Sequence, residues 1–241
     1  MMFRPTLLAA VALFAPVMAI AAPAAAVPTP LPPENSWASA PQASVADGWD
    51  TDAERSGFTT SPTYAQTLAF LRRLQQHSPW ITLDTFGHSA QGRELVYARA
   101  SKGGRERPVV LIQAGIHAGE IDGKDAGLML LRDIAARGRG DLLDAVDVVF
   151  VPVLNVDAHE NSSEHGRPSQ RGPARKGART SAQGLDLNRD YARLESPEVR
   201  AVVQLLRRLD PALYIDVHVS DGTDYQYDIT WAFAGWGTYA R

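Results

Sequence analysis

The residues best suited to chemistry in this sequence are a histidine and a glutamate three positions apart, His117 and Glu120. They directly follow Val109–Ala114, an uncharged apolar run typical of a strand buried on both faces. Imidazole and carboxylate are good zinc ligands, and catalytic zinc sites often combine two His, one Glu and a water. At this spacing both side chains face the same way if the turn opens into a helix. By itself the pair is also typical of an ordinary helix start, so a metal site needs a third ligand.

His218 is the best candidate for that ligand, because it follows a second apolar stretch, Leu213–Val217. Adjacent parallel strands bring their carboxyl ends together, and ligands of open α/β sheets bind beyond those ends. The alternative for His218 is a hydrogen-bonded histidine at the end of a strand. The other histidines lie in polar turns and loops, where we expect solvated side chains: His77, His88, His159 and His165.

A third group of residues could bind an anion, namely Arg179, Asn188 and Arg189. An arginine offers a planar two-pronged donor and an asparagine adds an amide donor, a combination that suits a carboxylate. Four more basic residues lie close by in the chain: Arg167, Arg171, Arg175 and Lys176. The alternative interpretation is therefore a basic surface loop.

The elements that must position these residues alternate between strand and helix. Strands are predicted over residues 81–86, 94–100, 109–114, 146–154 and 213–217, the last two as further buried strands. Helices are predicted over residues 63–77, 122–137 and 196–209. A hairpin-like connection joins the first two strands, and residues 160–184 form a long polar loop. This order predicts an α/β fold with a mixed, largely parallel sheet flanked by helices.

Composition excludes several classes of protein. The 241 residues carry a formal net charge of -3, so no global charge favours nucleic acid as a partner. Cys is absent, which excludes disulfides, thiolate ligands and a Cys nucleophile. Any metal in this protein is therefore held by nitrogen and oxygen.

The N-terminal region is predicted to direct export. Residues 1–21 have the features of a secretory signal peptide, with Arg4 before an apolar core and Ala19-Ile-Ala21 as a cleavage pattern. The alternative is an uncleaved N-terminal anchor. Residues 22–50 are rich in Ala and Pro and are interpreted as a linker. We therefore expect a secreted or periplasmic protein, with no membrane span after signal cleavage and a folded domain from residue 51.

Taken in chain order, the three groups resemble the zinc metallocarboxypeptidases, the carboxypeptidase A-like peptidases. The resemblance rests on His117-x-x-Glu120, then Arg179-x8-Asn188-Arg189, then His218. The sequence Gln-Gly-Leu-Asp-Leu-Asn-Arg at residues 183–189 is similar to the signature of the regulatory and bacterial branches of that family. The similarity covers about residues 60–235 and implies a carboxypeptidase-like fold.

The resemblance implies one Zn²⁺ held by His117, Glu120 and His218. It also implies that Asp186 orients His117 by a hydrogen bond from outside the ligand set. The bound metal would activate a water molecule for hydrolysis of C-terminal residues of peptides.

The resemblance further implies a binding site for a peptide or small peptide-like substrate with a free C-terminal carboxylate. Asn188 and Arg189 would bind that carboxylate. Arg179 would polarise the scissile carbonyl and stabilise the oxyanion. Arg171 and Arg167 are weaker candidates for this last role.

One part of the family pattern has no match in this sequence. In the family the general base is a Glu on a strand several dozen residues beyond the third ligand. Here 23 residues follow His218 (241 − 218), and none of them is Glu. Several acidic and tyrosine residues lie too soon after His218 to match the family's base or its substrate-capping Tyr: Asp221, Asp224, Tyr225, Tyr227, Asp228 and Tyr239.

From this departure we expect residues 51–241 to be the N-terminal part of a zinc peptidase domain that is incomplete at its C-terminus. Such a chain could hold the metal while lacking the carboxylate that takes the water's proton. Two alternatives stay open. One is a non-catalytic zinc- or peptide-binding relative, and the other is a deacylase of N-acyl amino acids.

Overall fold

The structure, a computed structural model, describes residues 47–170, 172–220, 223, 226–227 and 229–232. The predicted signal peptide and most of the predicted linker lie outside the described residues. So do several residues considered above: Arg171, Asp221, Asp224, Tyr225, Asp228 and Tyr239. Within the described part, no helix combines the length and the apolar character needed to span a membrane. The boundaries of leader, linker and domain stay predictions.

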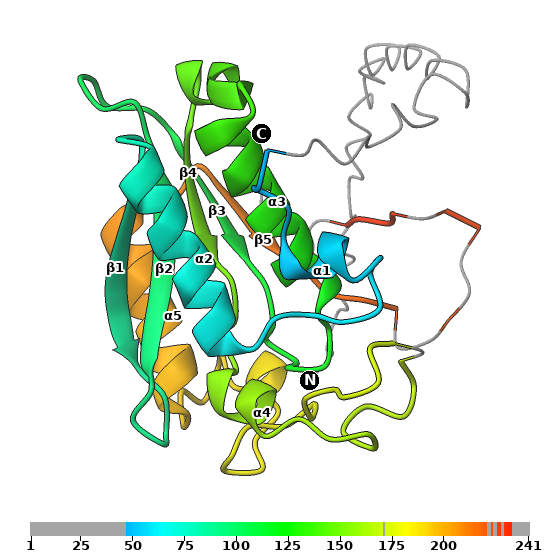
Figure 1. The fold of residues 1–241 in the computed structure, drawn as a ribbon. Helices are drawn as coiled ribbons and strands as arrows, with labels where there is room; N and C mark the ends of the chain where they lie inside the picture. The colour runs from blue at the N-terminus through cyan, green and yellow to red at the C-terminus, as the bar shows by residue number, and fades with distance from the viewer. Residues whose placement is uncertain (1–46, 171, 221–222, 224–225, 228, 233–241) are drawn as a thin grey trace, which may run out of the picture. The chain divides into compact units, whose positions relative to one another are not determined.

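The described chain forms one mixed sheet with helices on both faces (Figure 1). The strands are β1 (Ile81–His88), β2 (Glu94–Ala100), β3 (Val109–Gln113), β4 (Asp147–Val151) and β5 (Leu213–Asp216). The α-helices are α1 (Asp52–Arg55), α2 (Tyr64–His77), α3 (Asp122–Ala136), α4 (Val156–Glu160) and α5 (Pro197–Leu209). Short 3₁₀-helices span Arg139–Asp144 and Leu187–Arg189. The predicted α/β architecture is confirmed.

The strand order is β1-β2-β4-β3-β5. β1 pairs with β2, and β2 with β4, in antiparallel register, whereas β3 pairs in parallel with both β4 and β5. The parallel half of the sheet therefore carries the strands that are followed by His117 and His218. The antiparallel half provides the predicted hairpin.

Alternating side chains of the sheet build a core on each face. On one face, Leu71 of α2 and Leu131 of α3 pack in the same cluster as Phe150 of β4. On the other face, Leu205 of α5 packs with the cluster that contains Leu111 of β3. Burial of each such side chain stabilises the fold by roughly 2 kcal/mol. The result is a sheet held between α2 and α3 in front and α5 behind (Figure 1).

Two of the predicted helices begin where their capping residues require. Thr63 forms a capping box with Gln66 at the start of α2. Ser196 accepts a hydrogen bond from the backbone N–H of Val199, and Pro197 takes the first turn of α5. These caps satisfy backbone donors that a helix start leaves open.

The strand Leu213–Asp216 differs from its prediction as a buried strand. β5 lies at the edge of the sheet and pairs with β3 on one side. Leu213 is 44% exposed and Ile215 is 38% exposed, although both are large apolar residues. The apolar run therefore correctly indicated a strand. Because β5 is an edge strand, the side chains of Leu213 and Ile215 are exposed on one face of the sheet. By contrast, every residue of β4 is buried, as predicted.

A buried carboxylate in α4 anchors the turn between β1 and β2. Asp157 in α4 accepts hydrogen bonds from the Ser89 hydroxyl at 2.7 Å and from the Gln91 backbone N–H at 2.9 Å. It also pairs with the Arg93 guanidinium at 2.6 Å, and its own side chain is fully buried. Charge-assisted hydrogen bonds of this kind are stronger than neutral ones. Asp157 thus joins the β1–β2 turn to the segment that follows β4.

We predict that Asp157→Ala lowers the free energy of unfolding by about 3 kcal/mol, because three hydrogen bonds to a buried charge are lost. Urea unfolding followed by circular dichroism measures this change. The matched control is Asp141→Ala, whose exposed partner is Arg139 and whose loss costs less than about 1 kcal/mol. Equal unfolding midpoints for the two variants would contradict the anchoring role.

Candidate metal centre

The turn after β3 is shaped by backbone contacts with the neighbouring segment. Gly115 has φ +64°, a left-handed conformation that favours glycine, and a Cβ there would lie 3.1 Å from Val153 Cα. The backbone N–H of Asn155 donates to the Gly115 carbonyl at 2.9 Å, and the Asn155 side-chain amide donates to the Ile116 carbonyl at 3.3 Å. The turn that presents the predicted ligand pair is therefore held from the end of β4.

Two further contacts bring the three predicted ligands together. The backbone N–H of Glu120 donates to the His117 carbonyl at 3.0 Å, which closes a tight turn just before α3. The backbone N–H of Val217 donates to the Gln113 carbonyl at 2.9 Å, which continues the β3–β5 ladder toward His218. As the parallel pairing predicts, both strand ends reach the same edge of the sheet.

His117, Glu120 and His218 each contribute one possible ligand atom, and these atoms lie within 4.8 Å of one another. The Nδ1 of His117 is 2.8 Å from Glu120 Oε1, and the Nδ1 of His218 is 3.1 Å from Glu120 Oε2. The two imidazole ring centroids are 5.2 Å apart. Both Nδ1 atoms therefore face the same carboxylate.

Each histidine ring also contacts an aspartate of its own on the side opposite Glu120. The Nε2 of His117 lies 3.2 Å from Asp186 Oδ1, and the Nε2 of His218 lies 3.0 Å from Asp216 Oδ2. Each Nε2 thus lies within hydrogen-bond reach of an aspartate, and each Nδ1 is directed toward Glu120. Asp186 was expected in this position. Asp216 was not, although its spacing of two residues before His218 at a strand end places both on one side of the chain.

The charges in the centre shift the pKa values of its groups. Burial alone would raise the pKa of Glu120, but hydrogen bonds from His117 and His218 outweigh it and hold that pKa at about 2. Hydrogen bonds to Asp216 and Glu120 raise the pKa of His218 to about 10, against the opposing effect of burial. Burial alone would also raise the pKa of Asp186, but hydrogen bonds from His117 and Arg179 outweigh it, so this pKa lies below its ordinary value.

The donor set fits a divalent metal ion. Two imidazole nitrogens and one carboxylate match the His₂Glu set of catalytic zinc sites, in which a fourth position is left for water or substrate. His117 and Glu120 are buried, whereas the His218 side chain is 31% exposed. His218 is therefore the most exposed of the three ligand candidates.

The predicted carboxylate-binding residues connect to this centre through Asp186. The Arg179 Nε donates to Asp186 Oδ2 at 3.0 Å, and the Asn188 backbone N–H donates to Asp186 Oδ1 at 3.0 Å. Asn188 and Arg189 belong to the 3₁₀-helix that Asp186 caps, and the Arg189 side chain is exposed. The structure thus places Arg179, Asn188 and Arg189 in one segment that is attached to His117.

Arg167 takes a position that was not predicted. Its guanidinium is buried and donates to Glu120 Oε1 at 2.6 Å. From the sequence, Arg167 was one of several basic loop residues and a weaker candidate for carbonyl polarisation, and neither observation indicated its contact with Glu120.

His159 also differs from its prediction as a solvated loop residue. It lies in α4 with its side chain only 10% exposed, and its Nε2 is 2.9 Å from the Nζ of buried Lys124. Its environment is buried because α4 packs against the segment before α2 and the start of α3. His77, His88 and His165 are exposed, as expected.

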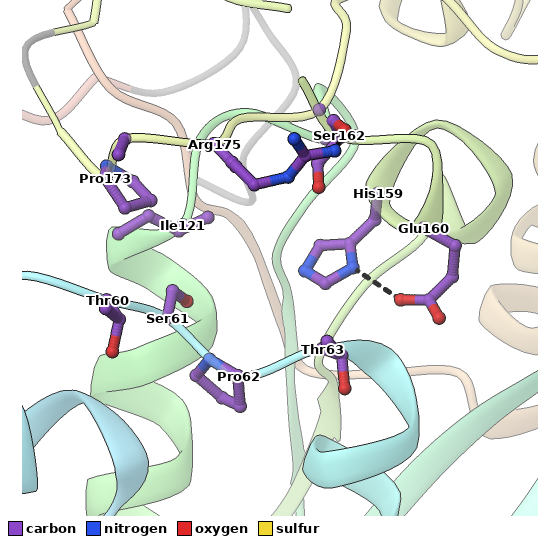
Figure 2. A pocket seen from close by; sticks show the side chains of 13 residues that line it. Thr60, Ser61, Pro62, Thr63, Ile121, His159, Glu160, Ser162, Pro173 and Arg175 are labelled. Atoms are coloured by element: carbon purple, nitrogen blue, oxygen red, sulfur yellow. Dashed lines mark hydrogen bonds and ion pairs between the residues drawn. The ribbon is translucent and has the colours of Figure 1, made fainter. Parts of the chain in front are cut away.

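His159 lines a pocket of about 350 Å³ beside the ligand turn, shown in Figure 2. The walls come from residues 60–63, from Ile121 before α3, from Glu160 and Ser162, and from the loop at Pro173 and Arg175. None of the three ligand candidates lines this pocket. The pocket is therefore distinct from the metal centre.

Comparison with known proteins identifies the class. The chain matches the zinc carboxypeptidase family over residues 67–230, which is more than half of its length. It therefore belongs to the zinc carboxypeptidases.

Individual relatives agree with this class. Carboxypeptidase 2 of Trichophyton equinum is 29% identical over 171 residues, which cover 66% of this chain and 29% of the relative. Carboxypeptidase D of Anas platyrhynchos is 28% identical over 160 residues, covering 59% of this chain and 11% of the relative. The chain thus spans a minor part of the length of the curated relatives it matches.

Solved structures show the same fold. A metallo-carboxypeptidase from Burkholderia cenocepacia has a TM-score of 0.57 at 23% identity, covering 68% of this chain and 43% of that one. A metallo-carboxypeptidase from Pseudomonas aeruginosa, in complex with (2-guanidinoethylmercapto)succinic acid, has a TM-score of 0.53 at 22% identity. It covers 68% of this chain and 41% of that one.

We predict that Asp186→Asn and Asp216→Asn each weaken Zn²⁺ binding by roughly 10–100-fold, because each removes the charge that orients a histidine ring. Competition with a chromogenic chelator measures the affinity. Glu195→Gln is the control, since its exposed carboxylate pairs with Arg193 at 3.5 Å. If both aspartate variants bind zinc as tightly as the control, the two carboxylates do not position the ligands.

Proposed function

We propose that this protein is a zinc-dependent carboxypeptidase in which His117, Glu120 and His218 hold one Zn²⁺. The observation that carries the proposal is the convergence of these ligand atoms within 4.8 Å at the ends of β3 and β5. The orientation of both histidine rings by Asp186 and Asp216 supports it. Membership of the zinc carboxypeptidase family supports it independently.

The protein's own residues would divide the chemistry among them. When bound, zinc lowers the pKa of a bound water to about 7 and polarises a carbonyl group. Asp186 and Asp216 keep the histidine Nδ1 atoms directed at the centre. Arg179 would polarise the scissile carbonyl and stabilise the developing oxyanion. Its side chain is 36% exposed beside Asp186, so a substrate can reach it.

Asn188 and Arg189 bind the free C-terminal carboxylate of a peptide or small peptide-like substrate. Arg189 is exposed and can offer its planar pair of donors to that group. The Pseudomonas aeruginosa relative, whose structure contains a succinic acid derivative, shows that a protein of this fold accepts a small carboxylic acid. Export by the leader at residues 1–21, before a linker to residue 50, is part of the same proposal.

Hydrolysis requires one more group, a carboxylate that takes the proton of the attacking water. No Glu follows His218 in the sequence, so binding of zinc and peptide is the property that the proposed site itself predicts. The proposed zinc ligands and the proposed carboxylate-binding residues Asn188 and Arg189 all lie among the residues that the structure describes. Measurements of zinc binding and of peptide binding therefore test the proposed site directly.

We predict that His117→Ala abolishes stoichiometric zinc binding, because one of only two imidazole ligands is lost. Metal analysis after dialysis measures the content. His88→Ala is the control, since His88 is exposed at the end of β1 and should leave the content unchanged. Full zinc content in His117→Ala would refute the assignment of the centre.

We predict that the zinc-loaded wild-type protein binds a peptide with a free C-terminus at least about tenfold more tightly than the C-terminal amide of the same peptide. The reason is that the amide cannot form the charged hydrogen bonds of a carboxylate. Isothermal titration calorimetry measures both affinities, and Arg189→Met should remove the difference. A preference for N-acyl amino acids with no cleavage of peptide C-termini would favour the deacylase. Binding of zinc and peptide without release of C-terminal residues by the full reading frame would favour the non-catalytic relative.

A further inference from the structure

Arg167 makes a direct contact with one of the proposed zinc ligands. Its guanidinium NH2 donates to Glu120 Oε1 at 2.6 Å, and the two side chains are only 5% and 2% exposed. A charge-assisted hydrogen bond in such a buried place is strong and geometrically specific. The residue lies in the long loop of residues 160–184, 47 positions from Glu120 in the chain.

The loop is closed so that Arg167 stays on the inside. The backbone N–H of Ser163 donates to the Lys176 carbonyl at 3.0 Å, and the N–H of Lys176 donates back to Ser163 at 2.8 Å. A third bond, from the Ala118 N–H to the Ala178 carbonyl at 3.1 Å, ties the loop to the ligand turn. Arg167 therefore reaches the ligand turn from a fixed backbone.

A glycine in the ligand turn makes this approach possible. A Cβ at Gly119 would lie 2.8 Å from the Cβ of Arg167 and 2.5 Å from the Gly177 carbonyl oxygen. A side chain at residue 119 would therefore displace the arginine or the loop. The turn that presents His117 and Glu120 is shaped to accept Arg167 against it.

The contacts of Glu120 divide evenly between its two oxygens. Oε1 faces the His117 Nδ1 and receives the Arg167 guanidinium. Oε2 faces the His218 Nδ1 and accepts the Val219 backbone N–H at 3.2 Å. The histidines lie where a metal would bind, whereas Arg167 and Val219 hold the carboxylate from outside.

We propose that Arg167 is a positioning residue of the metal centre, which fixes the orientation of the Glu120 carboxylate for metal ligation. This inference rests on the proposed zinc site and adds a residue to it. The role differs from carbonyl polarisation, because the Arg167 side chain is 5% exposed and already directed at the ligand. Arg179, whose side chain is 36% exposed, is better placed to meet a substrate.

The test compares zinc affinity in Arg167→Met, Arg167→Lys and the wild-type chain by competition with a chromogenic chelator. Loss of the outer contact should weaken Zn²⁺ binding at least about tenfold in Arg167→Met. Arg167→Lys should also weaken it, because an ammonium cannot reproduce the planar geometry of a guanidinium. Arg175→Met is the matched control in the same loop, since its guanidinium donates to the Ser162 carbonyl, and its affinity should stay within about twofold.

The visible absorption spectrum of the Co²⁺-loaded protein provides a second measurement, because it reports the geometry of the ligands. It should change in Arg167→Met and stay unchanged in Arg175→Met, which a general loss of stability would not produce. If Arg167→Met does not fold, Arg167→Lys carries both measurements.

The outcomes separate this inference from the proposed function. A wild-type chain that binds no zinc overturns the metal centre and the role of Arg167 together. A wild-type chain that binds zinc, with Arg167 variants that bind it equally or more tightly, overturns the role of Arg167 alone. Weakened binding with a changed Co²⁺ spectrum supports it.

Discussion

The buried carboxylate of Glu120 is the interaction on which the rest of the site depends. A carboxylate that is 2% exposed is costly to bury unless donors surround it. Here His117, His218, Arg167 and the Val219 N–H all face its two oxygens. They come from three places in the chain, so this one charge draws together the segments after β3 and β5 and the long loop.

The parallel half of the sheet makes this convergence possible. β3 pairs in parallel with β4 and β5, so three strand ends reach one edge of the sheet. The segment after β4 then holds the ligand turn through Asn155 and the hairpin turn through Asp157. The site is thus built on rigid elements, with loops added around it. Asp186 extends it by joining His117 to the segment that carries Arg179 and Asn188.

Much of this arrangement could be predicted from local patterns. Apolar runs indicated the strands, and apolar residues at helical spacing indicated the helix that the structure shows at Tyr64–His77. The ligand candidates His117 and His218 were identifiable because each follows such a run. Burial was harder to predict, since His159 and the edge strand β5 depend on which elements pack beside them. A local sequence carries no information about its distant neighbours.

Residue type and spacing alone therefore determined the fold class and the ligand candidates, because these depend on hydrophobic period and on the chemistry of single side chains. The family was indicated by the resemblance of three motifs in chain order. Tertiary structure alone decided that Arg167 meets Glu120 and that Asp216 holds His218. Arg167 lies 47 residues from its partner, and only the closed loop and the bare backbone of Gly119 bring the two together. The number and direction of the contacts around a buried charge are properties of packing, which no run of residues specifies by itself.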